Sequence, residues 1–319
     1  MAKVSLLRAK SYEFHALQES LETLLEPLGS INNFVKKGDR VLLKPNLLTG
    51  SRPTKECVTR PELVYCIAKM VIAAGGKPFL GDSPAFGSAI GVAKANGYLP
   101  FLEELNLPIV EFQGKRYQTV SEEFNHLRLC KEAMEADVVI NIPKLKSHAQ
   151  LTVTMGVKNL FGCVPGKMKA WWHMEAGKDS ARFGTMLAET ARAINPNLTI
   201  LDGIIGHEGN GPSGGEPRYL GILGASSDVF ALDRSIIEIV NVEPASVPTV
   251  AASIRLGFCS NLEAIDFPLL QPEELKILDW KLPENLMPID FGMPRVIKST
   301  FKHLYIKFIK ERISAYSGR

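Results

Sequence analysis

The sequence has few cysteines, and none of them lies in a motif that would hold a metal ion or a cluster. The five cysteines are odd in number and widely spaced, and no two form a C-x-x-C pair. The sequence therefore disfavours a structural zinc site, and it predicts no intrinsic iron–sulfur cluster bound by a local cysteine motif. Scattered cysteines instead suit reduced thiols in a cytosol.

Long apolar runs are also missing. No stretch approaches the roughly 18–20 apolar residues that a membrane-spanning helix needs. The opening MAKVSLLRAKSYEF does not read as a signal peptide, because charge returns after a short apolar run. We therefore expect a cytoplasmic protein. Its 319 residues, 45% of them hydrophobic, are enough to bury a substantial core.

Familiar catalytic and nucleotide-binding motifs are absent or incomplete. No G-x-S-x-G occurs, so Ser-His-Asp catalysis lacks its usual signature. His207-Glu208 fails the H-E-x-x-H zinc pattern because residue 211 is glycine. The segment GNGPSG at residues 209–214 matches G-x-G-x-x-G, but a strand-like sequence follows it where a dinucleotide site needs a helix. We therefore predict no Rossmann NAD site.

Negative charge is missing from one long stretch. Residues 138–174 contain no aspartate or glutamate, whereas residues 142–173 contain five lysines and two histidines. The net charge of +3 comes from the basic tail at residues 295–319, so the rest of the chain is mildly acidic and this stretch is a local exception. Ordinary solvated faces mix both signs. We therefore expect the stretch to bind a small anion; nucleic acid is disfavoured, because Trp171-Trp172 is the only hint of base stacking.

The sequence predicts an α/β fold with a mostly parallel sheet flanked by helices. Apolar segments rich in valine, isoleucine and leucine alternate with segments of helical period, as is typical of parallel strands covered on both faces. A capping box from Thr59 to Glu62 is expected to begin one helix. Residues 113–130 read as a β-hairpin insertion. Strands are expected at residues 39–46, 77–84, 108–112, 137–145, 197–206 and 219–227, and helices at residues 60–76, 88–105, 180–195 and 228–241.

Two regions are expected along the chain: an α/β core at residues 1–260 and a C-terminal extension at residues 261–319, which ends in a basic amphipathic helix. In residues 295–319, lysines alternate with apolar residues at helical spacing, namely Ile297, Phe301, Leu304, Phe308 and Ile309. We expect this tail to dock on the core. Peripheral attachment to an anionic membrane, or docking of an acidic partner such as a ferredoxin, is the alternative.

Four predicted strands end in polar loops. In open parallel sheets, ligands bind outside the carboxyl ends of the strands, where such loops converge. We therefore expect the loops to face one cleft that brings lysine, histidine and acidic side chains together. The loops contain Lys44 to Asn46, Asp82 to Pro84, Lys144 to His148, and Asp202 with His207 to Asn210.

These segments also resemble the family catalogued as domain of unknown function 362. The resemblance rests on VLLKPNL, CVTRPELV, AAGGKPFLGDSP, ADVVINIPKLKSHAQLTVTMGVKNLFGCVPG, ILDGIIGHEGNGPSGG and GASSDVFALD, which follow in order between about residues 40 and 235. Many members of that family carry an appended module that binds [4Fe-4S] clusters, which this chain lacks. The resemblance points to Lys44, Asn46, Asp82, Pro143, Lys144, Lys146, His148, Lys158, Asn159, Gly162, His173, Asp202, Gly211, Pro212 and Asp233.

Three functions remain open. The first is an enzyme acting on a small carboxylate or phosphate; the family context favours a redox-linked reaction with a separate ferredoxin-type electron donor. Its substrate-binding residues are predicted to be Lys44, Asn46, Lys144, Lys146, Lys158, Asn159 and Gly211, and its catalytic residues His148, His173, Asp82 and Glu208. The second is a non-redox isomerase or lyase, whose metal would be held by His148, His173, His207 and Asp202. The third is an anion-, membrane- or partner-binding protein without catalysis.

Overall fold

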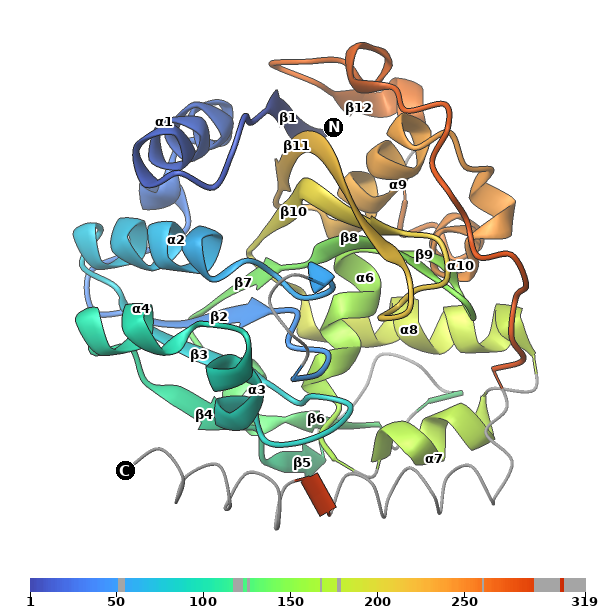
Figure 1. Cartoon of the computed structure of the whole chain (residues 1–319), viewed down its shortest axis with the longest axis horizontal. Helices are drawn as coiled ribbons and strands as arrows, with labels where there is room; N and C mark the ends of the chain where they lie inside the picture. The colour runs from blue at the N-terminus through green and yellow to red at the C-terminus, as the bar shows by residue number, and fades with distance from the viewer. Residues whose placement is uncertain are drawn as a thin grey trace.

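The computed structural model describes residues 1–50, 55–116, 123–124, 127–166, 168–176, 179–259, 261–289 and 305–306. A mostly parallel β-sheet forms its centre (Figure 1). The strands follow the order β12-β1-β11-β10-β7-β2-β3-β4, and β8 and β9 attach beside β10. Their bounds are β1 (Ala2–Arg8), β2 (Arg40–Pro45), β3 (Lys77–Asp82), β4 (Ile109–Glu111), β7 (Val138–Ile142), β8 (Lys144–His148), β9 (Thr152–Thr154), β10 (Leu198–Glu208), β11 (Glu216–Ser226) and β12 (Ile265–Asp266).

The predicted mostly parallel α/β fold is confirmed. Strands β10, β7, β2, β3 and β4 run parallel to one another. Strand β11 is antiparallel to both β10 and β1, and it joins the parallel half to the N-terminal strand. The carboxyl ends of β2, β3 and β7 therefore meet at one edge, where the polar loops begin.

Helices cover both faces of the sheet (Figure 1). Side chains alternate along β2, so Val41 and Leu43 pack with α1 and α2, whereas Leu42 packs on the opposite face with α8. Both faces are apolar for this reason. The α-helices are α1 (Phe14–Leu25), α2 (Pro61–Ala73), α3 (Ala89–Ala95), α4 (Leu99–Glu104), α5 (Lys131–Met134), α6 (Gly156–Asn159), α7 (Met168–Glu175), α8 (Ser180–Ile194), α9 (Val229–Ile239) and α10 (Pro248–Arg255).

Shorter elements complete the fold. The predicted hairpin insertion pairs β5 (Gly114–Arg116) antiparallel with β6 (Arg128–Cys130); residues 117–122 and 125–126 between them lie outside the described part. The 3₁₀ helices are η1 (Glu26–Leu28), η2 (Ile31–Asn33), η4 (Leu160–Cys163), η5 (Pro244–Ser246), η6 (Leu262–Ala264) and η7 (Pro272–Leu275).

The segment predicted to be a C-terminal extension, residues 261–319, is described at residues 261–289 and 305–306. Strand β12 pairs in parallel with β1 at the edge of the sheet. The predicted basic helix at residues 295–319 lies outside the described residues, apart from Tyr305 and Ile306. In the part of the chain that is described, no helix combines the length and the apolar character required to cross a membrane.

Candidate functional site

Strand β8 is the backbone of the candidate site. Its side chains alternate, so Lys144, Lys146 and His148 lie on one face, while Leu145 packs into the core on the other. The strand runs parallel to β10, with Lys144 in register with Asp202 and Lys146 with His207. All five side chains of β8 are buried, so each cation on this strand needs a partner within the protein.

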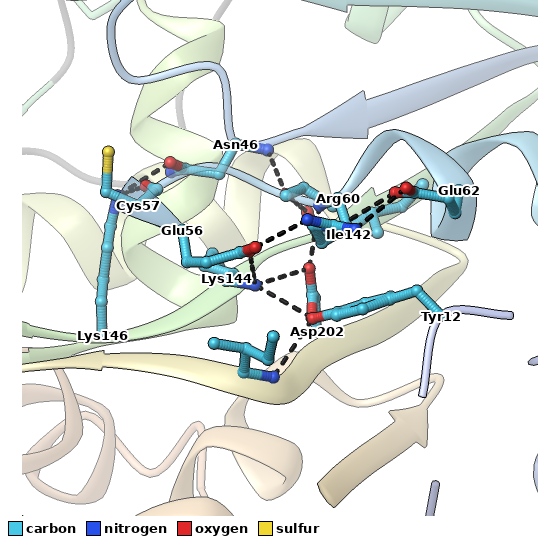
Figure 2. A network of polar contacts seen from close by, with 12 residues as sticks. Tyr12, Asn46, Glu56, Cys57, Arg60, Glu62, Ile142, Lys144, Lys146 and Asp202 are labelled. Carbon is cyan, nitrogen blue, oxygen red and sulfur yellow. Dashed lines mark hydrogen bonds and ion pairs between the residues drawn. The ribbon is translucent and has the colours of Figure 1, made fainter. Parts of the chain in front are cut away.

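Lys144 has such partners (Figure 2). Its Nζ lies 3.1 Å from Asp202 Oδ2 and 3.6 Å from Glu56 Oε2, and it donates to the Tyr12 hydroxyl at 3.1 Å. Asp202 also accepts hydrogen bonds from Tyr12 OH, at 2.5 Å, and from the backbone N–H of Arg60, at 2.9 Å. Burial, together with the Asp202 carboxylate, raises the pKa of Tyr12 well above its usual value. This lysine is therefore fully neutralised.

Lys44 is neutralised in the same way. Its Nζ lies 2.9 Å from Asp82 Oδ1, and both side chains are almost completely shielded from solvent. The other oxygen of Asp82 accepts from the backbone N–H of Leu47 at 2.8 Å. Gly162 packs against this pair: a side-chain carbon at that position would overlap Asp82 Oδ1 and would lie 2.6 Å from Lys44 Nζ. The glycine thus lets η4 close over the ion pair.

Three asparagines link the strands beneath these lysines. The Asn159 amide donates to Lys44 O, at 3.1 Å, and to Asn141 Oδ1, at 2.8 Å. Its oxygen accepts from Asn46 Nδ2, at 3.0 Å, and from Lys44 Nζ, at 3.4 Å. Because these bonds use the hydrogen-bonding capacity of the amide, Asn159 holds the framework of the site together.

Thr59 fixes Asn46 from the other side. Its hydroxyl donates to Ile142 O, at 2.7 Å, and accepts from the backbone N–H of Asn46, at 2.8 Å. The predicted capping box at Thr59 is therefore wrong: helix α2 begins at Pro61, and the residue at its N-cap is Arg60, without a side-chain cap. The threonine hydroxyl is instead used to join two strand ends.

Lys146 differs from Lys44 and Lys144. Its Nζ donates to Asn46 Oδ1, at 2.8 Å, and to Cys57 O, at 3.0 Å, and Figure 2 shows it reaching these two groups. Both acceptors are neutral, and among the described residues no carboxylate forms an ion pair with this ammonium group. Burial lowers the pKa of Lys146 to about 8, and the charges of Lys144 and Lys44 contribute.

Two further lysines share this situation. Half-buried Lys158 lies on α6 with its Nζ 4.6 Å from the centre of the Phe161 ring, and half-buried Lys169 lies on α7 and donates to Ser83 O. Burial and the charges of neighbouring lysines lower the pKa of Lys158 to about 7. Burial lowers the pKa of Lys169 to about 8. We refer to Lys146, Lys158 and Lys169 as the lysine cluster.

Asp233 positions α6, which carries Lys158. Its Oδ1 accepts from the backbone N–H of Gly156, at 2.7 Å, and its Oδ2 from that of Val157, at 2.9 Å. A side chain at Gly156 would overlap Val229 and Asp233, so this glycine allows the close approach. Burial raises the pKa of Asp233 to about 7.

His148 and His173 adjoin the lysine cluster. The Nδ1 atom of His148 accepts from the backbone N–H of Gln150 at 3.1 Å, which leaves the proton of the neutral ring on Nε2. Burial lowers the pKa of His148 well below its usual value, and the charges of Lys158, Lys146 and His173 act in the same direction. His173 packs against Phe183, with ring centres 4.6 Å apart.

Other predicted site residues are engaged elsewhere. Glu208, at the far end of β10, pairs with Arg218 at 3.1 Å and accepts from the backbone N–H of Lys281 at 3.1 Å. Gly211 packs against strand β8, where a side-chain carbon would lie 2.8 Å from Ser147 Oγ, and its peptide bond to Pro212 is cis.

The four proposed metal ligands also point to different partners. Asp202 forms an ion pair with Lys144. His207 Nε2 accepts a hydrogen bond from the backbone N–H of Gly215 at 3.1 Å, whereas His148 and His173 lie beside the lysine cluster. Among the residues that the structure describes, no group of three or more histidine, cysteine or acidic side chains is arranged to hold a metal ion.

Several residues that contribute to the site were not predicted as site residues. Tyr12 and Glu56 complete the environment of Lys144, although neither lies in a recognisable motif. Asn141 is buried within strand β7 and was not predicted as a site residue, although it lies in the segment ADVVINIPKLKSH that carries the family resemblance. Lys169 lies in the stretch without acidic residues, so the charge pattern was the signal that could have identified it.

Comparison with known proteins supports the family resemblance. The family model described as "Domain of unknown function (DUF362)" matches residues 41–238. A protein named thylakoid-associated protein sll1697, from Synechocystis sp., is 67% identical over 316 residues, which cover 99% of this chain and 98% of that protein.

A comparison with solved structures found a weak similarity. The lactate racemase apoprotein from Thermoanaerobacterium thermosaccharolyticum superposes with a TM-score of 0.47 and 16% sequence identity over 72% of this chain. The match spans 54% of the racemase chain, about half of its length. At this level of similarity no activity is transferred.

Proposed function

Since the chain belongs to the DUF362 family, a family defined by a domain of unknown function, we propose its function from the geometry of the site. The proposed function is that of an enzyme that binds a small carboxylate or phosphate at the lysine cluster. His148 would provide a neutral imidazole next to the bound anion. Buried or half-buried ammonium groups and a neutral histidine are a combination suited to holding an anionic substrate and moving a proton on it.

The observation that carries this proposal is a contrast between two groups of lysines. Lys44 and Lys144 each have a buried carboxylate within about 3 Å. The lysine cluster has no ion-pair partner in the described part of the chain, and Asp82, the acidic group that acts on all three of its members, is already bound to Lys44. Desolvated cations are costly without a counter-charge. An anionic ligand would supply it.

The remaining predicted residues take supporting roles in this proposal. The Lys44–Asp82 and Lys144–Asp202 pairs and the Asn159 amide hold the strand ends in place. Asn46 positions the ammonium group of Lys146. Direct contact with the substrate falls to the lysine cluster and His148. The redox-linked version with a ferredoxin-type donor stays a prediction.

Thermal unfolding tests anion binding. Oxalate or inorganic phosphate should raise the melting temperature of the wild-type protein in a saturable manner, beyond the effect of sodium chloride at equal ionic strength, because a ligand stabilises the state that binds it. Lys158→Met should abolish this shift. Exposed Lys37 is the matched control, and Lys37→Met should retain it. A wild-type response no larger than that to sodium chloride would contradict the proposal.

A second candidate function is peripheral attachment to an anionic membrane through residues 295–319. Two observations favour it: the tail is basic and amphipathic in sequence, and the relative from Synechocystis sp. is named as thylakoid-associated. The wild-type protein should sediment with phosphatidylglycerol vesicles but not with phosphatidylcholine vesicles. Replacing Lys298, Lys302 and Lys307 by glutamate should release it; retention by the triple variant would contradict this attachment.

A further inference from the structure

Lys158 differs from the other two members of the lysine cluster because its Nζ has no hydrogen-bond acceptor in the part of the chain that the structure describes. Lys146 donates to two neutral oxygens, and Lys169 donates to the backbone oxygen of Ser83. Within the described residues, the Nζ of Lys158 has neither a hydrogen-bond acceptor nor an ion-pair partner, and it rests against the face of the Phe161 ring. The amino group is therefore not held by an acceptor group in the described part of the protein.

The surroundings of Lys158 favour that neutral amine. Burial and the charges of Lys169, Lys146 and Lys44 all lower its pKa. Neighbouring cations and desolvation are two of the ways in which proteins turn a lysine into a nucleophile towards carbonyl groups. Lys158 as a whole is only partly shielded from solvent.

The backbone around Lys158 is also fixed. Two backbone hydrogen bonds to Asp233 hold the start of α6, and Asn159, the next residue, is bonded to two strand ends. These contacts fix the backbone from which the Lys158 side chain extends, so an anion bound at the lysine cluster would meet this side chain from a constant position.

We propose that Lys158 Nζ forms an imine with a small anionic carbonyl compound, a 2-oxo carboxylate, whose carboxylate is held by Lys146 and Lys169. This step names the substrate class and rests on the proposed function above. It adds covalent catalysis to the proposed function, which by itself requires only that the site binds an anion.

The chemistry balances without an oxidant or a reductant. The lone pair of the amine attacks the carbonyl carbon, a C–N bond forms, and the π electrons of the C=O bond move to oxygen. Both amine protons pass to that oxygen, which leaves as one molecule of water, and a C=N bond remains. The Nε2–H of neutral His148 can donate a hydrogen bond to the carbonyl oxygen as charge develops there.

Reductive trapping tests the imine. Wild-type protein is incubated with pyruvate and sodium cyanoborohydride at pH 7, and modified lysines are identified by peptide mass spectrometry. Lys158 should be labelled at least about tenfold faster than exposed lysines such as Lys10 and Lys37 in the same molecule, since an ordinary lysine is almost fully protonated at this pH. Lys158→Arg, which keeps the charge but cannot form an imine, should lose the label.

The outcomes separate this proposal from the proposed function. If oxalate shifts the wild-type melting temperature and Lys158 remains unlabelled, the imine is wrong and anion binding stands. If neither occurs, both are wrong. Equal labelling of Lys158 and the exposed lysines also contradicts the imine. The comparison among lysines within the wild-type protein needs no variant to fold.

Discussion

Lys44 Nζ lies 2.9 Å from Asp82 Oδ1 in a fully buried ion pair, and the same carboxylate acts on Lys146, Lys158 and Lys169 without pairing with them. One carboxylate thus faces more positive charge than it can neutralise. Lys44 is thus paired and stabilises the fold. In our proposal, the lysine cluster is neutralised only when an anion binds.

Replacing one lysine of each kind should change stability in opposite directions. Lys44→Met leaves Asp82 as a buried carboxylate without its partner, and we expect it to lower the free energy of unfolding by about 3–5 kcal/mol. Lys158→Met removes a desolvated cation without breaking an ion pair, and we expect it to raise that free energy by about 1 kcal/mol at pH 7. Denaturant unfolding measures both. Equal destabilisation by the two variants would refute the distinction.

Gly162→Ala should disturb the Lys44–Asp82 pair directly. The added carbon would overlap Asp82 Oδ1 and lie 2.6 Å from Lys44 Nζ, so we expect a loss of at least about 2 kcal/mol. Gly97→Ala is the control: no atom lies within 4 Å of its added carbon, and only its positive φ of 81° opposes the change, at about 1 kcal/mol. Similar losses in urea unfolding would show that the close approach at Gly162 does not matter.

The pH dependence of Asp233 follows from its raised pKa. Between the unfolded value near 4 and the folded value of about 7, the folded protein binds more protons than the unfolded chain, so stability falls as pH rises through this interval. Asp233→Asn cannot titrate. Its stability deficit relative to wild type, which arises because an amide offers one acceptor to two backbone N–H groups, should therefore shrink between pH 5 and pH 8. A deficit that grows over this range in urea unfolding would contradict the assignment.

Anion binding should take up protons. A bound anion favours the ammonium form of each member of the lysine cluster, whose pKa values lie at about 7 to 8. Oxalate carries a constant charge above pH 6, so its affinity should fall as pH rises from 6 to 9.5. Calorimetry in buffers of different ionisation enthalpy measures the proton uptake near pH 8. Release of protons on binding would have the wrong sign for this site.

The sequence predicted the site best where the order of strands and helices alone determines which residues lie close together. Lys44 and Asp82 lie at the carboxyl ends of the parallel strands β2 and β3, and Lys144 comes shortly after the end of β7, so their convergence at one edge of the sheet could be predicted from the order of strands and helices. Alternation along β8 likewise places Lys144, Lys146 and His148 on one face.

Pairing within the site could not be predicted in the same way. Which lysines are neutralised depends on side-chain reach across the sheet, and on Tyr12 and Glu56, which lie outside any motif. Asn159 was expected to bind substrate, but its amide is used by Lys44, Asn46 and Asn141. Whether a polar side chain is available to a ligand depends on its tertiary partners.

Calorimetric titration of oxalate into the wild-type protein at pH 7 tests the central claim most directly. The account predicts saturable binding to a single site, lost in Lys158→Met and retained in Lys37→Met, with both variants folded by circular dichroism. Binding of equal strength and stoichiometry in Lys158→Met, or no binding in the wild-type protein, would contradict it.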